Sequence, residues 1–250
     1  MIEKYKPEKF FFEDRGYTPD GIFFEVAINN KIDVIEFHAG HKSGILNYKR
    51  FNKTNKMQHP FSVSKHYLNQ LIKNSELNLS NTKKVMKELK DCYESGEWYD
   101  EVGTSFFKKK ITRQQFIKKY DLKPNQPIAI IFTHILYDAT LFYGKDVFLN
   151  YQNWLIETIR YIKNVRNMNW IIKCHPANEV KNNRDGIPFS EIDVIKSFFG
   201  HVPSYIKIIE HSSDECTLSL YKFIDYCLTV RGTVGIEAAG VGMLQDVSNR

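Results

Sequence analysis

The order of apolar and polar stretches in the second half of the chain predicts alternating strands and helices. Amphipathic or short helical stretches separate the apolar runs IAIIFTH (128–134), NWIIKCHP (169–176), YIKIIE (205–210) and DYCLTV (225–230). Strands joined by helices of about 10–15 residues are typical of parallel βαβ units with right-handed crossovers. Because the runs do not alternate with polar residues, we expect a sheet covered by helices on both faces.

The first half of the chain has a weaker version of the same pattern. KFFFED (9–14), IFFEVAINN (22–30) and KIDVIEF (31–37) predict a strand, a helix and a second strand, with turn chemistry in RGYTPDG (15–21). From about residue 62 to 120 the pattern indicates polar amphipathic helices, one of them capped by Ser80 or Asn81.

The proline-containing stretch LKPNQP (122–127) reads as an entry into a second domain. We therefore predict an α/β fold with two Rossmann-like parallel-sheet halves that face a cleft. A partial Rossmann-like domain with a helical section is expected over 1–121, and a second Rossmann-like domain over 122–250. The last segment, GVGMLQDVSNR (240–250), contains no further strand, so we expect a truncated fold.

Composition narrows the class of protein. The 250 residues are 42% hydrophobic with a net charge of +6, and the basic residues are spread along the chain. The dense spots, FFKKK (106–110) and IKKY (117–120), read as solvated faces, and no nucleic-acid partner is expected. The cysteines have no CxxC spacing, and no apolar run approaches the ~18 residues of a membrane span. We expect a cytoplasmic protein with reduced thiols and no zinc site.

Candidate chemistry follows the strands, because ligands of open parallel sheets bind beyond the carboxyl ends of the strands. In IIKCHP, Lys173 and His175 lie on the same side of an extended chain and offer a cation and an imidazole to one phosphate. A solvated strand end followed by a turn histidine is the alternative interpretation.

The stretch RGTVGIEAAG (231–240) joins a strand to a helix of small residues. Backbone N–H groups at such a helix start bind phosphate, and Arg231, Gly232 and Thr233 lie there. Thr233 either serves as the N-cap or turns its hydroxyl group to the ligand. Glu237 is one residue too late for a capping box, so we assign it to ribose hydroxyl groups.

Two carboxylates are candidates for the catalytic base. Asp14 follows the first strand, and a helix cap or a salt bridge to Arg15 is its alternative role. His134 and Asp138 lie in FTHILYDATLFYG (132–144), whose aromatic residues either stack on a sugar or base or pack between domains.

These motifs, in this order, resemble bacterial glycosyltransferases of surface and capsule polysaccharide biosynthesis, a group that includes the capsule Kdo transferases. The resemblance covers mainly residues 126–240 and, more loosely, EDRGYTPDG (13–21). It implies a GT-B fold, with an acceptor-side domain over 1–121 and a nucleotide-sugar-binding domain over 122–250. It also implies a CMP- or UDP-linked sugar donor, a glycan or glycolipid acceptor, and a location that includes the periphery of the inner membrane. It implies no metal and no cofactor. Family members usually continue with Lys-Pro-Val where this chain reads MLQDVSNR.

Two other functions fit the same residues. A nucleotide-sugar 2-epimerase shares the fold and needs no acceptor. A truncated, non-catalytic domain would act as a binding or assembly module.

Overall fold

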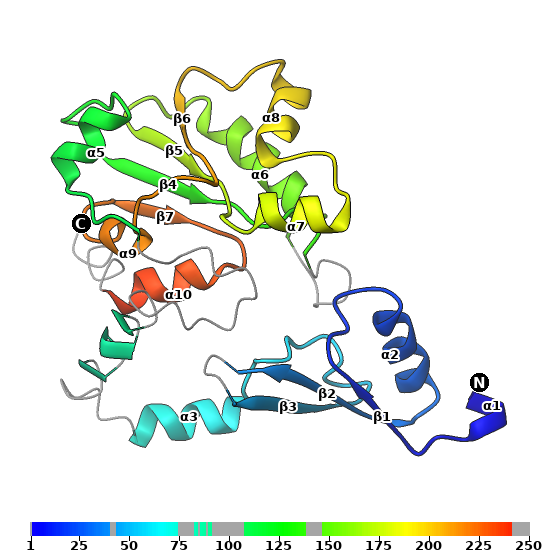
Figure 1. The fold of residues 1–250 in the computed structure, drawn as a ribbon. Helices are drawn as coiled ribbons and strands as arrows, with labels where there is room; N and C mark the ends of the chain where they lie inside the picture. Colours follow the sequence, from blue (N-terminus) through cyan, green and yellow to red (C-terminus); the bar gives the residue numbers. More distant parts are fainter. Residues whose placement is uncertain are drawn as a thin grey trace. The chain divides into compact units, whose positions relative to one another are not determined.

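The computed structural model describes residues 2–40, 44–74, 83–84, 86–88, 90–91, 108–138 and 147–241. The expected cap at Ser80 or Asn81 and the chain beyond Val241 lie outside the described residues. The chain divides into two compact units (Figure 1). The first comprises 1–78 and 137–147, and the second comprises 79–136 and 148–250.

The first unit contains a three-stranded mixed sheet in the order β1-β2-β3. Its elements are α1 (Ile2–Tyr5), β1 (Lys9–Phe12), α2 (Asp20–Asn29), β2 (Asp33–Ala39), β3 (Leu46–Phe51) and α3 (Lys65–Asn74). The parallel pair β1–β2 with α2 between its strands confirms the predicted strand, helix and strand. Its core consists of Phe12, Phe24, Ala27, Ile28, Val34 and Phe51.

Strand β3 was not predicted from the sequence. It pairs antiparallel with β2, with Phe51 opposite Val34, and most of its residues are exposed. The stretch LNYKRF has no apolar run like those that predicted the other strands. It is a strand because it pairs with β2.

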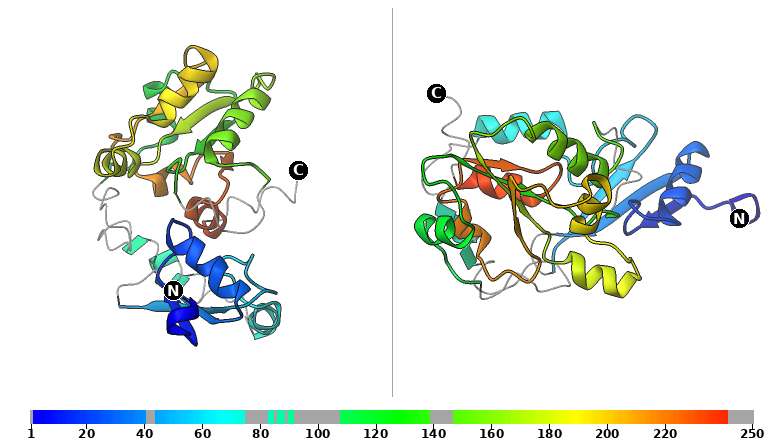
Figure 2. Two further views of the ribbon diagram at one scale, coloured as in Figure 1. Left: turned by 90° about the vertical axis from the view of Figure 1, so that its right-hand side faces the viewer. Right: turned by 90° about the horizontal axis from the view of Figure 1, so that it is seen from above.

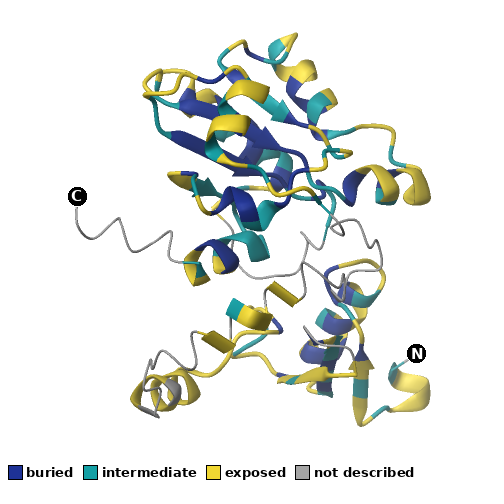
Figure 3. Ribbon diagram, turned by 60° about the vertical axis from the view of Figure 1, so that its left-hand side comes forward, coloured by how far each residue is buried: buried dark blue, intermediate teal, exposed yellow. Residues whose placement is uncertain are grey.

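The second unit contains a four-stranded parallel sheet in the order β6-β5-β4-β7. Its elements are α5 (Arg113–Lys119), β4 (Ile128–Phe132), α6 (Tyr151–Ile162), β5 (Asn169–Lys173), α7 (Asn178–Asp185), α8 (Glu191–Phe199), β6 (Ile206–Ile209), α9 (Thr217–Leu220), β7 (Tyr226–Leu228) and α10 (Thr233–Gly240). Every residue of β4 and β5 is buried (Figure 3). The predicted parallel alternation of strands and helices is confirmed.

Two apolar clusters show that helices cover both faces of this sheet. Residues of α6 and α8, such as Trp154 and Ile195, pack on one face, and residues of α5, α9 and α10, such as Phe116 and Ala238, pack on the other. The two layers can be followed in Figure 2. The face-to-face arrangement of two Rossmann-like halves stays a prediction.

The units divide the chain at different positions from the boundary expected at 121/122. Phe116 of α5 packs in one core cluster with Ile128 and Ile171, so this helix belongs to the second unit. Residues 137–147, which follow β4, belong to the first unit. Only the tertiary contacts of these segments determine their assignment, because their sequences alone are compatible with either unit.

Candidate functional site

The candidate binding residues of the second unit follow the carboxyl ends of its parallel strands. Thr133 and His134 follow β4, Lys173 ends β5, and His175 comes two residues later. Lys173 lies in register with Phe132 and Ile209, the last residues of the neighbouring strands. The sheet edge at which ligands of open parallel sheets bind therefore carries these side chains.

His134 connects the ends of β4 and β7. Its Nε2 atom lies 3.2 Å from Thr229 Oγ1 and accepts a hydrogen bond from the backbone N–H of Arg231 at 3.3 Å. The ring stacks on Tyr151, with 4.5 Å between centroids. Burial, with a smaller effect of the charge of Arg231, lowers the pKa of His134 to about 4. His134 is therefore neutral at pH 7, with its proton on Nδ1, and it holds the β7–α10 turn in place.

Gly232 is the N-cap of α10, and its lack of a side chain permits a close approach. A Cβ atom at this position would lie 2.7 Å from Thr229 Oγ1 and 3.4 Å from His134 Nε2. Gly232 N donates to Thr229 Oγ1 at 3.2 Å. Of the two roles expected for Thr233, that of N-cap was wrong, because Thr233 is already the first helical residue. A contact of its hydroxyl group with a ligand stays a prediction. The first turn of α10 offers N–H groups that have no acceptor within the helix.

His175 hydrogen-bonds to both neighbouring loops. Its backbone N–H donates to Thr133 Oγ1 at 2.9 Å and to Glu191 Oε1 at 3.0 Å, and its Nδ1 accepts from Ala177 N at 3.2 Å. Burial, followed by the effect of His134, lowers the pKa of His175 to about 3. The imidazole is therefore neutral at pH 7, with its proton on Nε2, so it can donate a hydrogen bond to a ligand but does not supply a positive charge.

Glu191, which the sequence analysis did not single out, holds the loops after β4, β5 and β6. It is the first residue of α8 and 0% exposed. Oε1 accepts from Thr133 Oγ1 at 2.7 Å, and Oε2 lies 2.9 Å from His211 Nε2. Burial opposes ionisation, but the hydrogen bonds, that of His211 foremost, hold the pKa of Glu191 below its usual value. The hydrogen bond that His211 donates to Glu191 raises the pKa of His211.

Nothing in the neighbouring sequence distinguishes Glu191 from an ordinary acidic residue in the first turn of a helix. Ser190 caps α8 and forms a capping box with Asp193, so the stretch SEID reads simply as a helix start. Its partners Thr133 and His211 are distant in sequence, and only the folded sheet brings them together.

Lys173 and Glu237 lie in surroundings that the sequence did not indicate. Burial, followed by the charge of Lys108, lowers the pKa of Lys173 to about 8. Glu237 is buried and accepts a hydrogen bond from Tyr221 Oη at 2.9 Å. This contact gives Glu237 a structural role, which accounts for its position one residue after that of a capping box.

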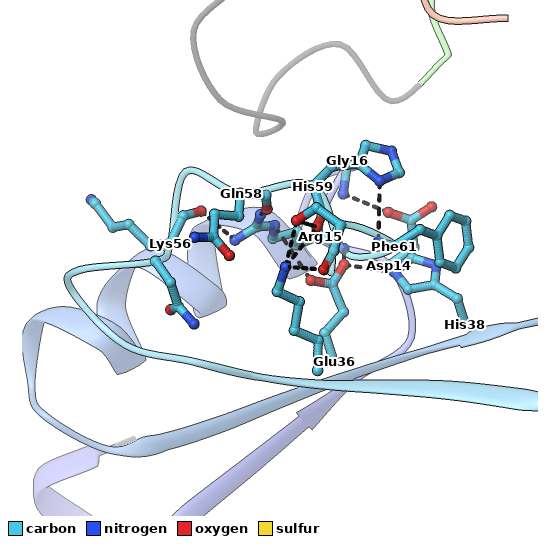
Figure 4. Close-up of polar contacts among 12 residues, drawn as sticks. Asp14, Arg15, Gly16, Glu36, His38, Lys56, Gln58, His59 and Phe61 are labelled. Atoms are coloured by element: carbon cyan, nitrogen blue, oxygen red, sulfur yellow. Dashed lines mark hydrogen bonds and ion pairs between the residues drawn. The ribbon is translucent and has the colours of Figure 1, made fainter. Parts of the chain in front are cut away.

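Asp14 lies in the first unit, in the polar network that Figure 4 shows. Its Oδ1 accepts from Gly16 N at 2.7 Å. The adjacent Arg15 is 0% exposed, and its guanidinium lies over the rings of Phe24 and Phe51, at 4.3 and 4.2 Å from their centroids. This packing fixes the position of the turn that contains Asp14.

Arg15 also connects that turn to the rest of the unit. Its guanidinium donates to the backbone carbonyls of Lys56 and Gln58 at 2.6 Å and forms an ion pair with Glu36, whose Oε2 lies 3.4 Å from Nε (Figure 4). Glu36 Oε1 lies 2.8 Å from His38 Nε2. Asp14, Glu36 and His38 thus come together beyond the parallel pair β1–β2.

Asp138, the other candidate base, belongs to the first unit and accepts a hydrogen bond from Tyr17 Oη. Its neighbour in sequence, His134, belongs to the second unit. The structure therefore assigns both candidate bases, Asp14 and Asp138, to the first unit.

Two sets of potential metal ligands have their ligand atoms within 4.8 Å of one another among the described residues. One comprises Cys174, Glu191 and His211, and the other comprises Asp14, Glu36 and His38. In both sets the glutamate is buried and already accepts hydrogen bonds from protein donors. These contacts explain the two clusters as structural networks.

Comparison with known proteins supports the fold. No protein-family model and no curated protein sequence matches the chain. Among solved structures, Thermosulfurimonas dismutans KpsC, a beta Kdo 2,4 transferase, matches with a TM-score of 0.50 and 11% identity. The match covers 94% of this chain and 66% of that one. Within the described residues, no helix is both long and apolar enough to cross a membrane. The chain thus has a mixed α/β fold similar to that of a capsule Kdo transferase.

Proposed function

We propose that the protein is a GT-B-like glycosyltransferase of surface or capsule polysaccharide biosynthesis. It transfers a sugar, Kdo-like or other, from a CMP- or UDP-linked donor to a glycan or glycolipid acceptor. The observation that carries the proposal is the β7–α10 turn. There His134 and Thr229 lie in close contact with Gly232, the N-cap of α10. These contacts place the first turn of α10 after the carboxyl end of β7. The similarity of the fold to KpsC supports the choice of sugar class.

The donor nucleotide binds at this edge of the second unit. The N-terminus of α10 and the cations Lys173 and Arg231 stabilise the negative charge that develops on the departing phosphate. His175 adds a neutral hydrogen-bond donor, which follows from its lowered pKa. A ribose contact of Glu237 stays a prediction, since Tyr221 is the partner that the structure gives it.

The acceptor binds on the first unit, where Asp14 or Asp138 removes the proton of its attacking hydroxyl group. Asp14 is partly exposed, as a base that contacts substrate must be. Its turn is fixed by the buried Arg15, which keeps the carboxylate in a defined position. We place the enzyme in the cytoplasm, where nucleotide sugars are made.

Calorimetric titration with CMP, UDP and their sugar conjugates tests the proposal. We expect one nucleotide to bind, and we expect His175→Ala to weaken that binding by about tenfold, because a hydrogen bond to phosphate is lost. His201→Ala, which changes an exposed histidine after α8, is the matched control. The absence of binding by any nucleotide would refute the proposal.

Turnover separates the remaining alternatives. A transferase requires an acceptor glycan for product formation, whereas a 2-epimerase converts the sugar nucleotide alone. Binding without turnover under either condition would indicate a non-catalytic module.

A further inference from the structure

A pocket of the second unit lies outside the site proposed for the donor nucleotide. Its volume is about 460 Å³, and it is lined by three residues of α7, by residues 187–190 before α8 and by residues 210–212 after β6. Ligand-binding pockets typically have volumes of about 300–1,000 Å³. None of its described lining residues is among those assigned to the donor phosphate.

The charges that line this pocket are predominantly negative. Glu179 of α7 and Glu210 line it, and neither carboxylate forms an ion pair or a hydrogen bond with a described residue. No lysine or arginine is among the described lining residues. His211 also lines the pocket, but its Nε2 lies 2.9 Å from the buried carboxylate of Glu191, so that pair adds no net positive charge. The pocket therefore favours a cation over a phosphate.

A buried amide oxygen indicates independently that a ligand is missing. Asn182 lines the pocket from α7 and is 8% exposed. Its Nδ2 donates to the carbonyl of Phe189 at 2.8 Å, and its Oδ1 has no hydrogen-bond partner within the described part of the chain. Because Nδ2 is used within the protein, Oδ1 is the atom that Asn182 offers to the pocket. A buried acceptor without a donor is unfavourable, and a ligand that donates to it removes this cost.

The two carboxylates and the amide oxygen are all hydrogen-bond acceptors. An ammonium group has three N–H donors and no acceptor, so it matches them in charge and in hydrogen bonding. A single metal ion matches less well, because Glu179, Glu210 and His211 are not among the sets of described residues whose ligand atoms lie within 4.8 Å of one another. Residues 187–189, with the ring of Phe189 42% exposed, provide apolar contact for a carbon skeleton.

We infer that the pocket lined by Glu179, Asn182 and Glu210 binds an organic ammonium group. An amino sugar and a polyamine both carry such a group. The inference does not depend on the proposed function, because it uses no residue of the donor site and its test requires no turnover.

Nuclear magnetic resonance titration of the full chain with glucosamine, at pH 6.5 and low salt, provides the test. We expect backbone amide signals of α7 and of residues 210–212 to shift, with a dissociation constant on the order of 1 mM, because the carboxylates are exposed and partly screened. Glucose has a hydroxyl group in place of the ammonium group. It should bind about tenfold more weakly, because charge-assisted hydrogen bonds are lost.

Glu179→Gln and Glu210→Gln keep the size of the side chain and remove its charge. Both residues are exposed, so we expect these variants to fold and each to weaken glucosamine binding by about fivefold. The double variant should weaken it by about tenfold or more. Glu157→Gln is the matched control, because Glu157 pairs with Arg160 on α6 and does not line the pocket. Its affinity should stay within about twofold of the wild type.

The absence of shifts with glucosamine, equal affinity for glucose, or equal effects of the control and the pocket variants would each overturn the inference. Displacement of glucosamine by an equal concentration of Mg²⁺ would also overturn it, because the pocket would then hold a metal ion. Spermidine separates the two sources of the ammonium group. Tighter binding than that of glucosamine, with the same dependence on Glu179 and Glu210, would assign the pocket to a polyamine, and weaker binding would assign it to an amino sugar.

Discussion

Removal of the carboxylate of Glu191 should strongly destabilise the second unit. It is 0% exposed and accepts hydrogen bonds from Thr133 Oγ1 and the backbone N–H of His175, while Oε2 pairs with His211. Glu191→Ala therefore leaves donors from the loops after β4, β5 and β6 without their common acceptor.

The expected loss of unfolding free energy follows from these contacts. A hydrogen bond to a charged group contributes about 1.5–3 kcal/mol, and removing one partner of a buried ion pair costs about 3–5 kcal/mol. Because the three contacts share one carboxylate, their contributions do not add fully. We expect a loss of about 3–5 kcal/mol. Glu191→Gln, which keeps one carbonyl oxygen as acceptor, should lose less.

Urea unfolding followed by circular dichroism measures this loss. Glu157→Ala is the matched control, because Glu157 pairs with Arg160 on the exposed surface of α6, and a change below about 0.5 kcal/mol is expected. A loss below about 1 kcal/mol for Glu191→Ala, or one equal to that of the control, would refute the reasoning.

The effect of Glu191→Ala should also depend on pH. The pKa of Glu191 is lowered from 4.5, so its contribution is present above pH 4.5 and is lost as the pH falls through the pKa of the folded state. The pKa of His211 is raised from 6.5, so its contribution is present below pH 6.5 and is lost as the pH rises through the pKa of the folded state. The difference between wild type and variant should be largest between those two values and smaller at pH 9.

Three further changes test the edge of the sheet. Gly232→Ala adds a Cβ atom 2.7 Å from Thr229 Oγ1, so we expect a loss of about 1–3 kcal/mol in urea unfolding, together with weaker nucleotide binding. Unchanged binding would show that the turn does not contact the nucleotide. Tyr221→Phe removes a donor from the buried carboxylate of Glu237 and should cost about 1–3 kcal/mol by thermal unfolding. The pKa of His175 is lowered from 6.5 to about 3, so the folded state binds its proton less readily, and stability should fall by about 1.4 kcal/mol per pH unit below pH 6.5. His175→Gln should make that slope shallower, and an unchanged slope would contradict a buried neutral imidazole.

The strands of the second unit could be predicted because each is a short, mainly apolar run. The run IAIIF, for example, is buried at every position. It forms β4, which lies inside the parallel sheet between β5 and β7. Helix α7 was not predicted, because NEVKNNRD is polar and has no apolar period, although Asn178 and Asn182 are buried. Strand β3 was not predicted either, because most of its residues are exposed and its extended conformation depends on pairing with β2.

The candidate site was predicted only in part, for a related reason. Residues directly after a strand, such as Lys173 and His175, could be placed at the sheet edge from the strand boundaries alone. The partners that decide their chemistry could not. His175 depends on Glu191, and Lys173 is affected by Lys108, and both partners come from segments distant in the chain.

The sequence by itself determined which segments are strands of the parallel sheet, and hence which residues follow its carboxyl ends. Local hydrophobic pattern is sufficient for this, because burial of an apolar run requires no specific partner. Only the tertiary structure decided which charges are neutralised, which histidines are neutral and which unit contains Asp138. Those properties depend on burial and on contacts between residues far apart in the chain, and the order of the amino acids does not show them until the chain is folded.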